Sequence, residues 1–389
     1  MIPLIGYTDR LSGRPGDTIA FKVSSCHQAP YNASLVRIIC ADPNPDGPGM
    51  REEPVDSDIN GSYPSRLQRF YPGSWGSAAV AGVFHGVGSF SLATTIWPTT
   101  PGGRRQGILS CHDTASGAGV DLYVTDDGDC GVSLRTPDGQ TAVAHTDEKL
   151  KARHWYRIWA SFDQPNARLS IGQQALHDNR KPACAGVNMK QTPALAQVNR
   201  AVIAAFNGEP VHGHFNGKIE SPMILDHPLD AHQVQWRGDQ PPDGRLAHWD
   251  FSRGISSTRI EDTGPGKFHG TLINLPTRAM TGSNWDAGEM CWRHAPAQYG
   301  AIHFHEDDIY DFNWKTDFRF TIPDNFPSGV YGVRIQCGDD FDVMPFFVCP
   351  PRGKPSAKLC VLVSTFTYTV YGNHARPNFA PAWLERIKA

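Results

Sequence analysis

The chain has 389 residues, enough for two or three domains with cores of their own. Its 38 Gly and 31 Pro follow no collagen-like period, so turn-rich globular structure is favoured over disorder, and the 10% aromatic residues support packed cores. The formal net charge of −3, with no block of Lys and Arg, argues against nucleic acid and against a membrane surface as partners.

The N-terminus and the cysteines predict a compartment. Residues Met1 to Arg10 lack the basic and apolar segments of a signal peptide, and no apolar run of about 18 residues could span a bilayer. The nine cysteines are an odd number without zinc spacing, and several lie in apolar strand patterns, as Cys40 and Cys349 do. We therefore expect reduced core thiols in a cytoplasmic protein.

Two strands are predicted in the first sixty residues. Pro15–Asp17 forms a turn before Thr18–Ser24, which alternates apolar and polar residues with period two. Ala33–Cys40 is a second strand, and residues 42–49 are rich enough in Pro and Gly to be loop. The pattern is typical of the opening strands of a β-sandwich.

Between residues 66 and 225, short strand patterns recur with turns between them. Asp126-Asp127-Gly128 predicts a hairpin turn between two of them, and helical periodicity is nearly absent, with at most two turns at Asp230–Trp236. So many short strands predict an all-β sandwich or jelly roll. The predicted strands are Phe90–Trp97, Gln106–Cys111, Val120–Thr125, Gly131–Arg135, Trp155–Phe162, Ala167–Ile171, Ala201–Ala205 and Phe215–Leu225.

The order of three of these strands, Phe90–Trp97, Trp155–Phe162 and Phe215–Ile219, resembles the laminin-G or concanavalin-like jelly roll. The later stretch from Ala247 to Ile273 resembles the strand that often opens such domains, and here it comes last. We therefore assign residues 63–285 to a jelly roll.

Residues 286–352 show the same alternating strand patterns, separated by turns, as the first sixty residues. Strands are predicted at Phe318–Ile322, Val330–Ile335 and Val343–Val348. Neither flanking group has enough strands to be stable alone, so we expect residues 1–62 and 286–352 to form one discontinuous β-sandwich that carries the jelly roll as an insertion.

The last segment, residues 353–389, differs from the rest. Leu359–Val363 is an unbroken apolar run bounded by Pro and Gly, the pattern of a strand buried on both faces of a parallel sheet. Ligands of open α/β sheets bind beyond the carboxyl ends of the strands, where Tyr368 and Tyr371 would lie. We expect a truncated α/β catalytic domain to start here.

Three clusters could be taken for metal sites. His303 and His305 would face the same way on a strand, but a metal needs a third ligand and an ordered surrounding shell, so structural or turn-forming roles are expected. His212 and His214 share that spacing and that expectation. The segment from Asp126 to Asp129 resembles a calcium loop but has no Glu at the last loop position, which favours a hairpin turn.

Taken as a whole, the chain resembles the N-terminal half of the large (beta) subunit of N,N-dimethylformamidase. The match runs in one order along essentially the whole chain, which makes it more specific than any single motif. It is carried by Gly6–Arg10, Leu35–Arg37, Gly47–Gly49, Arg105–Ile108, Leu246–Ser252, Asn284–Asp286, Gln298–Gly300, Phe304–Asp307, Pro345–Val348 and Pro350–Gly353.

The resemblance implies a cytoplasmic bacterial amidohydrolase that cleaves a small N-alkylformamide to formate and an alkylamine. It also implies partners: a small helical subunit and the remaining C-terminal part of the large subunit, in a hetero-oligomer with repeated copies. Outside the family, the alternative is a lectin-like carbohydrate-binding or protein-interaction module without catalysis.

The same resemblance implies a cofactor, a mononuclear non-haem Fe(III) held by two tyrosine phenolates and one glutamate in a glutamine-amidotransferase-like α/β domain. The family's Tyr-x-x-Tyr-x-Asn pattern is Tyr368 to Asn373 here, so Tyr371 is the expected iron ligand and Tyr368 the second choice. A phenolate suits Fe(III) because both are hard. The other ligands would lie outside this chain, so we expect the chain alone to be inactive.

Overall fold

The computed structural model describes residues 2–42, 46–178, 180–229, 231, 234, 241–355 and 357–371, with only the backbone for 369–371. Apart from α1 (Thr365–Tyr371) and the 3-10 turn η1 (Pro296–Tyr299), the regular structure in this part of the chain is β, which confirms the mainly β prediction. No helix in these ranges has the length and hydropathy that a bilayer-crossing segment requires. The chain divides into two compact units, residues 1–70 with 312–389 and residues 71–311.

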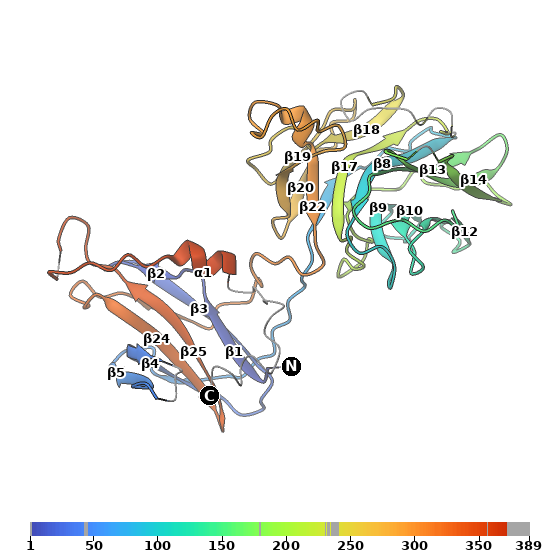
Figure 1. Ribbon diagram of the computed structural model, residues 1–389. Coiled ribbons are helices and arrows are strands. Elements are labelled where there is room, and N and C mark those ends of the chain that lie inside the picture. The colour runs from blue at the N-terminus through green and yellow to red at the C-terminus, as the bar shows by residue number, and fades with distance from the viewer. Residues whose placement is uncertain are drawn as a thin grey trace. The chain divides into compact units, whose positions relative to one another are not determined.

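The first unit is a β-sandwich built from both ends of the chain (Figure 1). One sheet has the order β1-β3-β23, and the other has the order β2-β25-β24-β4-β5 with β6 on β4. The strands are β1 (Leu4–Thr8), β2 (Ser12–Gly13), β3 (Thr18–Ser25), β4 (Tyr31–Ala41), β5 (Met50–Pro54), β6 (Gly61–Tyr63), β23 (Phe318–Thr321), β24 (Gly329–Cys337) and β25 (Asp340–Val348).

Strand pairing holds the two distant segments of this unit together. Phe21 of β3 lies opposite Phe318 of β23, and Leu35 of β4 lies opposite Val333 of β24. The alternating pattern of β3 directs Phe21 into the core, where its ring meets Phe346 of the other sheet at a centroid distance of 5.8 Å. The predicted discontinuous sandwich is therefore confirmed.

The second unit is a large antiparallel sheet folded over one core (Figure 1). Its path is β12-β11-β10-β9-β16-β7-β20-β19-β18-β17-β8-β13-β14-β15, and the end strands β12 and β15 lie close together, so the sheet nearly closes. Its strands are β7 (Trp75–Ala79), β8 (Phe90–Pro98), β9 (Gln106–His112), β10 (Gly119–Val124), β11 (Cys130–Arg135), β12 (Thr141–His145), β13 (Tyr156–Asp163), β14 (Arg168–Ala175), β15 (Ala183–Asn188), β16 (Arg200–Ile203), β17 (Gly217–Leu225), β18 (Arg245–Asp250), β19 (Arg259–Asp262), β20 (Gly270–Ile273), β21 (Thr277–Met280) and β22 (Ala301–Phe304).

The boundary of the inserted unit lies later than residue 285. β22 pairs with β17 and β21, and Ile302 and Phe304 are buried in the core of the large sheet. Residues 286–311 therefore pack with the insertion, although they contain few strand patterns of their own. Most of the short helical segment considered at Asp230–Trp236 lies outside the described residues.

The strand predicted at Leu359–Val363 is wrong. Residues 359–364 have no regular structure, and the side chains of Leu359 and Leu362 are 88% and 92% exposed. The chain then enters α1, so Tyr368 and Tyr371 lie on a helix and not beyond a strand. An apolar run becomes a strand only where a neighbouring strand supplies hydrogen-bond partners, and none of the described residues does so here.

Candidate functional site

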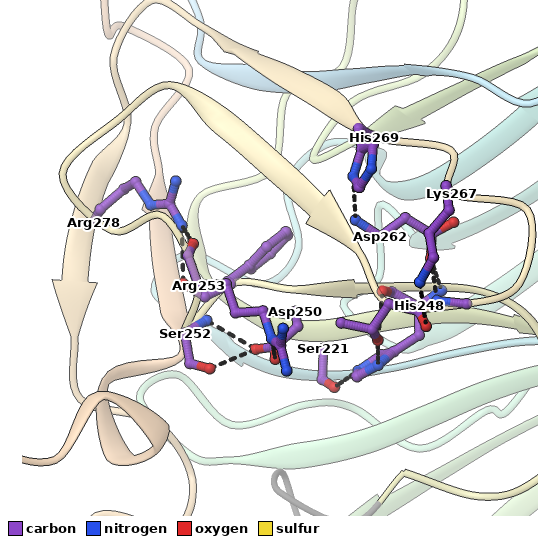
Figure 2. Close-up of polar contacts among 12 residues, drawn as sticks. Ser221, His248, Asp250, Ser252, Arg253, Asp262, Lys267, His269 and Arg278 are labelled. Atoms are coloured by element: carbon purple, nitrogen blue, oxygen red, sulfur yellow. Dashed lines mark hydrogen bonds and ion pairs between the residues drawn. The ribbon is translucent and has the colours of Figure 1, made fainter.

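A cavity of about 290 Å³ opens beside β17 and β18 in the second unit. Most of the residues that line it are polar or charged. Figure 2 shows side chains from both strands and from the following loops converging here. The polar lining residues include Glu220, Ser221, Arg245, His248, Asp250 and Arg253.

Ser221 enters this cavity because β17 contains a β-bulge. Glu220 pairs with Thr95 of β8 and Met223 with Ala93, so Ser221 and Pro222 together oppose a single residue. Pro222 is compatible with the bulge because a bulge breaks the hydrogen-bond ladder. Ser221 has a φ of 56°, a left-handed conformation that serine rarely adopts. The bulge therefore directs the Ser221 hydroxyl away from the regular alternation of the strand.

The Ser221 hydroxyl is bonded to an imidazole. Ser221 Oγ lies 2.5 Å from Nε2 of His248, and Nδ1 of His248 lies 2.7 Å from Oγ1 of Thr263 (Figure 2). Thr263 donates its own hydrogen to the carbonyl of His248 at 3.3 Å, so we assign the Nδ1 hydrogen to the bond with Thr263. Nε2 is then left as the acceptor for the serine hydrogen.

Burial keeps His248 neutral. His248 is 4% exposed, and desolvation lowers its pKa from 6.5 to about 4, against the opposing effect of Asp250. A neutral imidazole with a free lone pair on Nε2 is the form that acts as a proton acceptor. At neutral pH the ring is therefore uncharged, and its Nε2 can accept the hydrogen bond from the Ser221 hydroxyl.

A buried carboxylate fixes the strand that carries His248. Asp262 is 2% exposed, and its carboxylate accepts hydrogen bonds from the backbone N–H of His248 at 2.7 Å, Gly264 at 2.8 Å and Phe268 at 2.7 Å. Trp249, fully buried in the core, donates its indole N–H to the carbonyl of Phe268 at 2.8 Å. These hydrogen bonds hold the backbone that carries the imidazole in one conformation.

The charges around the cavity are unequally compensated. Asp250 accepts hydrogen bonds from Ser252 and from Arg253 Nε at 3.0 Å, so that pair is neutral (Figure 2). Burial raises the pKa of Glu220, whose carboxyl is also bonded to Ser283 at 2.6 Å. Among the described residues, Arg245 forms no ion pair and donates only to the carbonyl of Pro241 at 3.2 Å. Within the described ranges, Arg245 is therefore a cation of the lining without a carboxylate partner.

The burial of His248 predicts a loss of stability in acid. Between pH 6.5 and about 4 the unfolded chain binds a proton at this residue and the folded chain does not, so stability falls as pH falls through that window. We expect the contribution of His248 to the free energy of unfolding to be about 2 kcal/mol smaller at pH 4.5 than at pH 7. The free energy of unfolding is measured by urea denaturation at each pH. His248→Gln should remove that part of the pH dependence.

The exposed His154 supplies the control for this measurement, because His154→Gln should leave the acid sensitivity as it is. Burial also lowers the pKa of His303 to about 4. His303 should therefore account for part of the dependence of stability on pH that remains in His248→Gln. An unchanged slope in His248→Gln would contradict the neutral assignment.

The structure places the predicted iron ligands only in part. Tyr371 is the last residue of α1, and its side chain lies outside the described residues, so its ligand role stays a prediction. Tyr368 is 55% exposed and stacks on Phe347 with ring centroids 6.4 Å apart. Within the described ranges, no group of three His, Cys, Asp or Glu residues is arranged to hold a metal.

The histidine and aspartate clusters have local partners. The rings of His303 and His305 lie 4.1 Å apart, and His305 contacts Asp308 at 3.3 Å, a bond that raises its pKa. His214 is buried, and His212 packs on Phe206. Asp126–Asp129 is the β10–β11 hairpin turn, closed by the bond from the Thr125 N–H to the Asp129 carbonyl at 2.8 Å, as predicted.

Sequence reasoning missed Ser221 and His248. His248 lies in a stretch that was interpreted only as a strand, and Ser221 lies 27 residues away from it. The one available signal was Pro222 within a predicted strand, which indicates a bulge or an edge. Nothing in the residue spacing predicts that the two side chains meet.

Two curated proteins match nearly the whole chain. It is 37% identical to the N,N-dimethylformamidase beta subunit of Paracoccus aminophilus over 400 aligned residues, covering 96% of this chain and 52% of the relative. It is 35% identical to the beta subunit of the same name from Alcaligenes sp., with the same coverage. A family model for the C-terminal region of N,N-dimethylformamidase beta subunit-like proteins matches residues 277–383. The resemblance to the N,N-dimethylformamidase beta subunit is confirmed.

The likeness to this family concerns half of a larger polypeptide, because the chain spans about half the length of the curated relatives it matches. Among solved structures, a SAP-like pentraxin from Limulus polyphemus aligns with 54% of this chain and 82% of its own, at 14% identity and a TM-score of 0.32. A TM-score this low assigns no ligand or activity to the chain.

Proposed function

We propose that this chain is part of the large subunit of a hydrolase that cleaves N,N-dimethylformamide or similar N-alkylformamides to formate and an alkylamine. The observation that carries the proposal is the identity of 37% and 35% to two N,N-dimethylformamidase beta subunits across 96% of the chain. The word beta in those names supports a hetero-oligomer. We infer partners in a small helical subunit and in the rest of the large subunit, and a cytoplasmic location.

The cofactor we propose is a mononuclear non-haem Fe(III), with Tyr371 as one ligand. A phenolate oxygen fits this ion by its chemistry, and when bound the ion would supply Lewis acidity toward an amide carbonyl. One phenolate is not a complete ligand set, so the other ligands would come from the part of the relatives that this chain does not span. The two β units described here would serve as the scaffold on which that part assembles.

The test is a comparison of two preparations incubated with N,N-dimethylformamide. The complete large subunit with its partner should release formate and dimethylamine in equal amounts, and the 389-residue chain alone should release neither. The non-catalytic alternative predicts no release from either preparation, and that result would refute the proposal. Turnover by the 389-residue chain alone would refute the inference that the site needs further polypeptide.

A further inference from the structure

The Ser221–His248 pair differs from another buried serine contact of this unit, that of Ser91 with Ser161. Ser91 and Ser161 also bond to each other, at 2.8 Å, but both accept the backbone N–H of Leu229, and neither is among the residues that line this cavity. Ser221 is instead bonded to an imidazole and opens onto a cavity of about 290 Å³.

We propose that Ser221 is a nucleophile and His248 its general base, in an acyl-transfer site that is additional to the amide-hydrolysing centre proposed above. Three independent observations of geometry support this assignment. The Oγ–Nε2 distance of 2.5 Å is within reach for direct proton transfer. The contact with Thr263 at 2.7 Å orients the ring so that Nε2 faces the serine.

The third observation is the backbone of Ser221. Its left-handed φ of 56° at a bulge costs about 1 to 3 kcal/mol, and such strain persists only where the surrounding structure enforces it. β17 enforces it here, because Ile219 and Ile224, five residues apart, both enter the same core only if the bulge is present. The result is a serine hydroxyl held in one direction, toward His248 and the cavity.

The cavity indicates the class of substrate. Its small volume suits a short acyl group, and Phe251 and Ala297 give it an apolar wall. Arg245, without an ion-pair partner among the described residues, would attract a carboxylate on the substrate or the developing oxyanion. The substrate class is therefore a small carboxylic ester that carries a negative charge.

The reaction balances without a cofactor. The Ser221 hydroxyl gives its proton to Nε2 of His248 as Oγ bonds to the ester carbonyl carbon. The carbon–oxygen bond to the leaving alcohol then breaks, and that alcohol takes the proton from His248. Water then gives a proton to the same nitrogen as its oxygen bonds to the acyl carbon, and the bond from that carbon to Oγ breaks. Ser221 takes the proton back from His248, and the released carboxylic acid loses its own proton to solvent.

A fluorophosphonate probe on the intact 389-residue chain tests the nucleophile. Peptide mass spectrometry should find the phosphonyl group on Ser221. Ser221→Gly, which retains the bulge because glycine accepts a positive φ, should lose the label, and His248→Gln should slow labelling at least about tenfold. Ser133→Ala is the matched control, because the Ser133 hydroxyl also lines a cavity but donates to the carboxylate of Asp121.

The substrate class is tested with two 4-nitrophenyl esters, the acetate and the singly charged hemisuccinate. The chain should hydrolyse the hemisuccinate with the higher kcat/KM, and Arg245→Met should lower that preference at least about tenfold. The absence of label at Ser221 in the folded chain, or unchanged labelling of His248→Gln, would overturn the proposal. Equal labelling of Ser133 would overturn it as well.

Discussion

Replacing Tyr371 with phenylalanine in the complete assembly should reduce bound iron to background and lower formamide hydrolysis by at least about 100-fold. Phenylalanine fills the same space but has no oxygen, so it removes one anionic ligand without a change in packing volume. Loss of a directly bound ligand should exceed the effect of changing a group that only orients a ligand. Iron is measured by elemental analysis, so the result does not depend on activity alone.

Two other tyrosines provide controls for that experiment. Tyr368→Phe removes a phenol one helical turn away from Tyr371, and Tyr310→Phe removes one that is 74% exposed in the other unit. Both variants should keep their iron and their activity. If Tyr368→Phe loses its iron and Tyr371→Phe retains it, then Tyr368 is the iron ligand and Tyr371 is not. Undiminished iron and activity in Tyr371→Phe would contradict the assignment.

The β fold could be predicted because its evidence is local. In β3 the alternation that places Phe21 inward is visible in the residues themselves, and the Asp126-Asp127-Gly128 turn marks its own hairpin. Predicting the discontinuous sandwich required one further argument, namely that neither terminal group of strands has enough strands to be stable alone. The pairing of Leu35 with Val333 confirms that the two segments form one sandwich.

What could not be predicted depends on partners that are distant in sequence. β22 is four residues long, and its membership in the large sheet follows from pairing with β17 and not from its own pattern. Leu359–Val363 has the composition of a buried strand but no adjacent strand among the described residues, and there it is exposed. Composition indicates a preference for a strand, and tertiary contacts decide whether one forms.

The candidate site was hidden for the same reason. The chemistry of Ser221 and His248 exists only because the bulge in β17 and the pairing of Met223 with His248 bring the two side chains together. Tyr371, in contrast, came from a family pattern along the chain and needed no tertiary contact. The pattern along the chain and the tertiary contact therefore point to different residues.

Asp262→Ala should destabilise the second unit by about 3 to 5 kcal/mol. The substitution removes the acceptor of two buried N–H groups, those of His248 and Gly264, and of the partly buried N–H of Phe268, and each loss at a buried group costs about 1 to 3 kcal/mol. The three N–H groups share one acceptor, so the losses will not add fully. Because the chain has two units, denaturation should be followed by amide hydrogen exchange at these three residues.

Two further variants, Asp262→Asn and Asp250→Ala, test whether the destabilisation comes from the loss of the hydrogen-bond acceptor at residue 262. Asparagine keeps one carboxyl-type oxygen and should restore part of the stability, because Oδ1 alone accepts the bonds from His248 and Gly264. Asp250 has a side chain that is 25% exposed and paired with Arg253, so Asp250→Ala should cost less, within about 1 kcal/mol. If Asp262→Ala costs no more than Asp250→Ala, the carboxylate does not organise the loop, and the rigid mounting of His248 must come from Trp249 and the core beneath it.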